Sequence, residues 1–225
     1  MNKSIVLKIL NKIGIALTAL TAIGFASTNS ASAASVTTQL QDGFNSENNG
    51  VSTLNYNNFF NFDVKNGSVD LIGNGSIYDF LPGNGLYVDL DGSTNKAGTL
   101  QSKTTFNFQA GDTVNLSFQL AGNRRNNLTD SVTVSLGNLF SETFSLPGSQ
   151  AFTNFTRSFT VASITNATLD FKGIGADNVG LLLDNVTLTK SVPEPGSIIG
   201  LLAFGAFGAN TLLKRKQQQK ATAKA

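Results

Sequence analysis

Histidine and cysteine are both absent from this chain of 225 residues. Their absence removes the Ser-His-Asp and Cys-His constellations and the usual zinc ligands. Carboxylates remain, and Asp89 and Asp91 would project from one face of a strand at a separation of ~6 to 7 Å, which glycosidases can use. Because the pair leads into an Asp-Gly-Ser turn, a solvated strand end explains it better. We therefore expect no catalytic residue and no enzyme activity.

Few side chains in this sequence could hold a sugar. Sugar rings stack on aromatic rings, and the chain has three tyrosines and no tryptophan. The candidates for glycan binding are Tyr78, Tyr87, Arg124 and Arg125. The arginines could bind an acidic polysaccharide, although a solvated hairpin tip explains them equally well. For each tyrosine, packing in a core is the competing interpretation.

The segment from residue 35 to residue 190 has the pattern of an all-β protein. Short runs rich in Val, Leu, Phe and Thr alternate with clusters of Gly, Asn, Asp and Pro. Residues 60–64, 113–118 and 131–136 are apolar at every second position, as in strands with one buried face. About ten strands and no helix predict a two-sheet sandwich, most simply a jelly roll.

Residues 1–34 have the features of a secretory signal peptide. Lys3, Lys8 and Lys12 precede a short apolar stretch, and Ala31-Ser32-Ala33 supplies small residues for cleavage by signal peptidase. An uncleaved membrane anchor is the alternative. The pattern predicts an N-terminal signal helix that is removed on export.

Residues 196–213 form a second apolar segment without a single charge. Its length is near the lower limit for a transmembrane helix, and its large apolar residues cover every face. Lys214, Arg215 and Lys216 follow and would stop the helix at the cytoplasmic side, with residues 217–225 as a cytoplasmic tail. A buried C-terminal helix is the alternative, and this basic cluster argues against it.

Pro193-Glu194-Pro195, the apolar segment and the basic cluster occur in the order of a known tripartite tail. Residues 191–216 resemble the PEP-CTERM sorting signal of bacterial proteins. The resemblance implies that Pro193, Glu194 and Pro195 are recognised by an exosortase at the membrane, which is thought to cleave nearby. The two prolines keep the backbone extended and outside the helix. The chain would then be the substrate of a processing enzyme.

The charge of the central segment differs from that of the whole chain. The formal net charge of +2 includes many basic residues near both ends, whereas residues 35–191 hold eight basic and thirteen acidic residues. The exported part is therefore acidic, by about −5. This charge argues against a nucleic-acid partner. Without cysteine, the exported domain must rely on its hydrophobic core.

Several central motifs occur in the order of a second family. Phe62-Asp63-Val64, Val88-Asp89-Leu90-Asp91-Gly92 and Leu183-Asp184-Asn185-Val186 are similar to the galactose-binding-like jelly rolls of DUF642-type choice-of-anchor proteins. The resemblance implies a fold related to carbohydrate-binding modules. It also implies a structural Ca²⁺ between the first and last strands, with Asn45, Glu47 and Asp184 as ligands. Ca²⁺ takes oxygen ligands, and the alternative is that Asp184 only caps a turn.

Together these features predict an exported protein of the cell envelope, outer surface or extracellular matrix. It would be anchored transiently in the inner membrane, processed by an exosortase, and would bind or organise exopolysaccharide or envelope glycan. The first alternative is a structural or adhesive matrix protein that binds no glycan. The second is a glycan-active enzyme.

Overall fold

The structure, a computed structural model, describes residues 34–192. The predicted signal helix and transmembrane helix lie outside the described residues. Within residues 34–192, no helix has the length and apolar character needed to span a bilayer. The helical content there is one 3₁₀ turn, Glu47–Gly50.

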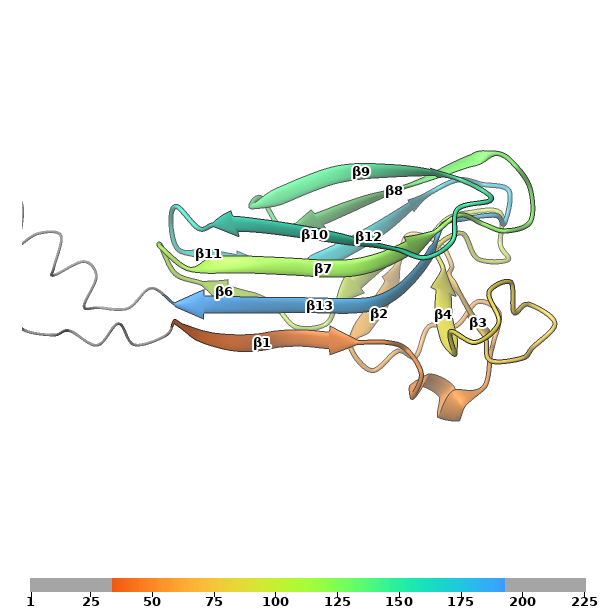
Figure 1. Cartoon of the computed structure of the whole chain (residues 1–225), viewed down its shortest axis with the longest axis horizontal. Helices are drawn as coiled ribbons and strands as arrows, with labels where there is room; N and C mark the ends of the chain where they lie inside the picture. Colours follow the sequence, from red (N-terminus) through yellow and green to blue (C-terminus); the bar gives the residue numbers. More distant parts are fainter. Residues whose placement is uncertain (1–33, 193–225) are drawn as a thin grey trace, which may run out of the picture. The chain divides into compact units, whose positions relative to one another are not determined.

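Thirteen strands make up most of the described chain (Figure 1). Their bounds are β1 (Ser35–Asp42), β2 (Phe62–Lys65), β3 (Asp70–Gly73), β4 (Leu86–Asp89), β5 (Thr99–Ser102), β6 (Phe106–Phe108), β7 (Thr113–Ala121), β8 (Thr129–Leu136), β9 (Phe140–Pro147), β10 (Thr153–Thr160), β11 (Thr165–Ala167), β12 (Leu169–Ile174) and β13 (Leu182–Val192). The prediction of an all-β chain is confirmed.

Two antiparallel sheets form the sandwich. Sheet A has the order β10-β7-β13-β4-β3, with β1 also paired to β13, and sheet B has the order β2-β5-β12-β8-β9. The long strands β1, β13, β7 and β10 lie side by side in Figure 1. The first strand thus pairs with the last, and the predicted two-sheet architecture is confirmed.

Alternation of side chains along the strands produces the core. In β7 and β8 every second residue is buried, as the sequence predicted for residues 113–118 and 131–136. In the strand predicted for residues 60–64 only Phe62 is fully buried. Phe60 is 64% exposed, because β2 begins two residues later, at Phe62. One face of each long strand therefore turns toward the opposite sheet and leaves the other face open.

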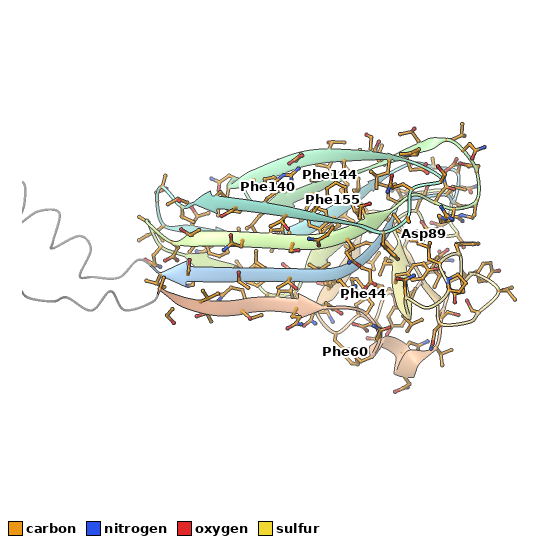
Figure 2. The ribbon with its side chains drawn as sticks, viewed as in Figure 1. Phe44, Phe60, Asp89, Phe140, Phe144 and Phe155 are labelled. Carbon is orange, nitrogen blue, oxygen red and sulfur yellow. The ribbon has the colours of Figure 1, made fainter. Side chains whose placement is uncertain are left out.

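Phenylalanine rings fill the space between the sheets. The fully buried ring of Phe118 lies 5.3, 5.8 and 5.4 Å from the ring centroids of Phe144, Phe155 and Phe171. Figure 2 shows Phe144 and Phe155 between β9 and β10. Because edge-to-face pairs add to area burial, this cluster joins sheet A to sheet B.

The edge strands β9 and β10 are joined by side chains. Phe140 stacks on Phe159 at 6.0 Å, and the Arg157 Nε–H donates to Glu142 Oε2 at 2.7 Å. The guanidinium also lies over the ring of Phe144, 5.2 Å from its centroid and within the ~6 Å reach of a cation–π contact. These side-chain contacts close the β9–β10 side of the sandwich, while the outward face of sheet B stays open.

Candidate functional site

The outward face of sheet B carries a polar hollow of about 430 Å³, which we call the sheet-B groove. Strand alternation places its side chains, because their neighbours along each strand point into the core. None of the lining residues is aromatic. The lining residues are Lys65, Asn66, Thr99, Gln101, Thr133, Ser135, Asp170 and Lys172.

The strand register orders these side chains in two rows across the sheet. One, the lysine row, contains Lys65, Thr99, Lys172 and Thr133, each directly opposite the next on neighbouring strands. The other, the aspartate row, contains Asp63, Gln101, Asp170 and Ser135 in the same relation. The rows lie two residues apart along every strand, which corresponds to ~7 Å.

The charged groups of the groove form few strong contacts with other protein groups. Lys65 Nζ lies 3.0 Å from Asp63 Oδ2 in an ion pair whose side chains are each nearly half exposed, and such pairs contribute little to stability. Gln101 donates to Asp170 Oδ2 at 3.3 Å, whereas the buried Asp170 Oδ1 has no partner among the described residues. The groove therefore offers ammonium groups to a ligand.

The predicted arginine pair divides into one structural residue and one surface residue. Arg125 forms an ion pair with the buried Asp89, donates to the Asn178 carbonyl at 2.6 Å and lies 5.1 Å from the ring of Phe80. Arg124 is exposed and donates to the Ser149 carbonyl. Both line a smaller hollow of about 290 Å³ with residues 126, 127, 148 and 149. Arg125 is thus largely committed to holding loops together.

Asp89 and Asp91 are both inaccessible to a sugar. Asp89 is 1% exposed, and its Oδ1 accepts from the backbone N–H groups of Asp91 at 3.0 Å and Gly180 at 3.1 Å. Burial raises the pKa of Asp89 to about 8, although the Arg125 charge opposes the shift. Burial likewise raises the pKa of Asp91, whose Oδ1 has no partner in the described part of the chain. Figure 2 shows Asp89 at the loop end of the sandwich.

Only one of the two predicted tyrosines can offer a ring face to a sugar. Tyr87 is fully buried: its hydroxyl accepts from Leu81 N–H at 2.9 Å and donates to Asp79 at 3.1 Å. Burial raises its pKa to about 12. A sugar-stacking role for Tyr87 is therefore wrong, and the core interpretation holds for it. Tyr78 is 37% exposed on the surface loop that precedes β4.

The three predicted calcium ligands are not assembled as one set. Asn45 accepts from Leu86 N–H at 2.8 Å, while the buried Glu47 accepts from Phe60 N–H at 2.8 Å and from the Tyr56 hydroxyl at 3.4 Å. Burial raises the pKa of Glu47. Among residues 34–192, no three acidic side chains converge to hold a metal.

A different pair of carboxylates lies where β1 and β13 meet. Asp42 and Asp184 are 8% and 2% exposed, and no described basic residue forms an ion pair with either. Burial, together with the negative charge of Asp42, raises the pKa of Asp184 to about 7. The Asn185 backbone N–H donates to Asp184 Oδ1 at 2.7 Å and opposes this shift. These are the oxygens in this region that a cation would stabilise.

The sequence analysis missed the sheet-B groove. Its only signal was that the outward positions of β8, Thr133 and Ser135, are small and polar. Lys65 and Lys172 are 107 positions apart in the chain, and strand pairing alone brings both beside Thr99. No local pattern could reveal that meeting.

The comparisons with known proteins find one sequence motif. Residues 191–216 match the model of the PEP-CTERM protein-sorting motif, which marks exported proteins that an exosortase processes. Pro193, Glu194, Pro195, Lys214, Arg215 and Lys216 belong to this segment and lie outside the described residues. No curated protein matches the chain in sequence.

Similar solved structures include an adhesin domain, a carbohydrate-binding module and an exo-β-1,3-galactanase. The K3 cleaved adhesin domain of Lys-gingipain from Porphyromonas gingivalis has a TM-score of 0.44 and 15% identity, over 69% of this chain and 99% of that one. The C-terminal CBM6 of LamC from Zobellia galactanivorans has a TM-score of 0.36 and 12% identity over the same shares. An exo-β-1,3-galactanase from Phanerochaete chrysosporium has a TM-score of 0.36 and 19% identity over 62% of this chain, which spans only 29% of its length.

The sorting motif and the strand pairing together describe the protein. The motif indicates an exported protein, the described residues form an all-β domain, and both features were predicted from the sequence. This chain therefore carries a PEP-CTERM protein-sorting motif at residues 191–216, and its described part is a two-sheet β-sandwich.

Proposed function

We propose that this protein is a non-catalytic glycan-binding protein of the cell surface or extracellular matrix. Signal peptidase and an exosortase would process its two ends, and the C-terminal segment would anchor it in the inner membrane until then. The observation that carries the glycan proposal is the sheet-B groove, where hydroxyl, amide and ammonium groups converge on a rigid sheet. Polar groups held by packed strands suit a hydroxyl-rich ligand.

Blocking the groove is expected to abolish polysaccharide binding. Thr133 lines the groove from β8, beside Lys172 on β12, so Thr133→Tyr should place a ring in the hollow while keeping a residue that favours strands. The measurement is co-sedimentation of the purified protein with exopolysaccharide from the producing cells. The matched control is Thr156→Tyr, at an exposed strand position of sheet A.

The structural alternative predicts a different result in the same assay. A matrix protein that binds only other proteins would sediment with no polysaccharide, and Thr133→Tyr would change nothing. That outcome would reject the glycan proposal. Turnover of a polysaccharide by the purified protein would instead support the enzyme alternative.

A structural Ca²⁺ is proposed at Asp42 and Asp184, where two buried carboxylates lie without a described basic partner. Of the residues first predicted, Asp184 fits this role. All four side chains accept a backbone N–H, Asn45 and Glu47 from Leu86 and Phe60, and Asp42 and Asp184 from Phe44 and Asn185. The choice of Asp42 and Asp184 therefore depends on their mutual repulsion. The ion would supply positive charge, and the two side chains would supply its oxygen ligands.

Calcium is expected to stabilise the protein more at pH 8 than at pH 5. The pKa of Asp184 is raised from 3.8 to about 7, so the folded state holds this proton more tightly than the unfolded chain does. Its stabilising contribution is complete below ~4 and is lost as the pH rises through ~7. In a chelator the melting temperature should therefore fall over this range, and calcium, which binds the ionised carboxylate, should restore several degrees at pH 8.

Differential scanning calorimetry at both pH values, with chelator or with calcium, measures this effect. Asp184→Asn should flatten the response to calcium, and Asp177→Asn, at an exposed position, is the control. Equal melting temperatures with chelator and with calcium at pH 8 would reject the proposed calcium site.

A further inference from the structure

We propose that the glycan held by the sheet-B groove is acidic along one edge only and lies across the strands, with its acidic edge over the lysine row. This inference rests on the glycan-binding function proposed above and names the class of glycan. It follows from the two charge rows, from the absence of aromatic residues in the groove lining, and from the spacing of the two lysines.

The groove lining favours an ionic ligand over a neutral one. Neutral polysaccharides gain much of their binding energy from aromatic rings, and none lines this hollow. Affinity must then come from hydrogen bonds and charge. Lys172 is exposed and forms no ion pair within residues 34–192, and Lys65 is held only by an exposed pair with Asp63. Both ammonium groups can turn to a carboxylate.

The positions of the lysines match a repeating acid. Lys65 and Lys172 lie on β2 and β12, one on each side of Thr99 on β5. Two strand spacings separate them, or ~9.6 Å, which is about the length of two sugar units in an extended chain. A polysaccharide with a uronic acid at every second sugar would place one carboxylate near each lysine.

The aspartate row disfavours acidic groups on the other edge of the bound polysaccharide. Asp63 and Asp170 lie opposite Gln101 on its two sides, ~7 Å from the lysine row. Their negative charge would repel a sulfate or carboxylate there. The carboxylate of Asp170, which lines the groove, would instead accept a sugar hydroxyl. The groove thus selects against polymers that carry charge on both edges.

Three soluble probes separate these properties: hyaluronate, with a uronic acid at alternate sugars; dextran, which is neutral; and dextran sulfate, which is charged all round. Binding to the purified protein is measured by titration calorimetry at low and high salt. We expect binding of hyaluronate in preference to both other polymers, weakening with salt. Lys172→Gln should lower the affinity on the order of fivefold, and Lys96→Gln, at an exposed turn, should leave it unchanged.

The aspartate row has its own test. Asp170→Asn should increase binding of dextran sulfate while leaving the melting temperature close to that of the original protein. Dextran bound as well as hyaluronate, with no effect of Lys172→Gln, would overturn the acidic-edge inference and leave glycan binding intact. Failure to bind any of the probes or the native exopolysaccharide would overturn glycan binding itself.

Discussion

Replacing Arg125 by alanine is expected to destabilise the domain by about 3 kcal/mol at pH 10, because it leaves the buried, ionised Asp89 without its cation. The loss also frees the loop carbonyl of Asn178 and uncovers the ring of Phe80. For a domain of this size the melting temperature should fall by roughly 6 to 12 °C. Thermal unfolding of the purified variant measures the effect.

The pH dependence and a second substitution test the cause. Burial already raises the pKa of Asp89 to about 8, and removal of Arg125 would raise it further. At pH 5 the carboxyl group is then neutral and the variant should lose less stability. Asp89→Asn in the same chain should recover much of the loss at pH 10. Arg124→Ala, which removes a neighbouring exposed arginine, should change the melting temperature little. Equal losses for both arginines would contradict this account.

Phe118→Ala is expected to cost about 3 to 5 kcal/mol. Its ring is fully buried and contacts aromatic rings from both sheets, Phe155 from β10 and Phe144 and Phe171 from β9 and β12. The cavity left behind cannot close without moving one sheet toward the other. Chemical denaturation, analysed for both the midpoint and its slope, gives the change in unfolding free energy.

Phe60→Ala is the matched control, because Phe60 is 64% exposed and lies outside β2. Figure 2 places it in the loop region, away from Phe144 and Phe155. The control should retain its stability within about 0.5 kcal/mol. A control loss as large as that of Phe118→Ala would mean that aromatic content in general, and not the cluster between the sheets, maintains the fold.

Parts of the candidate site were visible in the sequence and parts were hidden by the fold. The exclusion of histidine and cysteine chemistry depends on composition alone. In contrast, Tyr87 and Arg125 were proposed for a ligand, yet one lies in the core and the other holds Asp89. Burial of an aromatic ring or a charge depends on neighbours distant in the chain, such as Phe152 beside Tyr87. Residue type could not decide between a ligand contact and a structural contact.

The sequence by itself determined the class of fold and the presence of the sorting motif. Period-two alternation in β7 and β8 is a local property that already specifies a half-buried strand, and the sorting motif is a continuous segment. Tertiary structure alone decided which polar residues meet. The lysine row and the pair of Asp42 and Asp184 arise from antiparallel pairing between strands far apart in the chain. Register is set by the packing of whole strands against a common core, so no local pattern contains it.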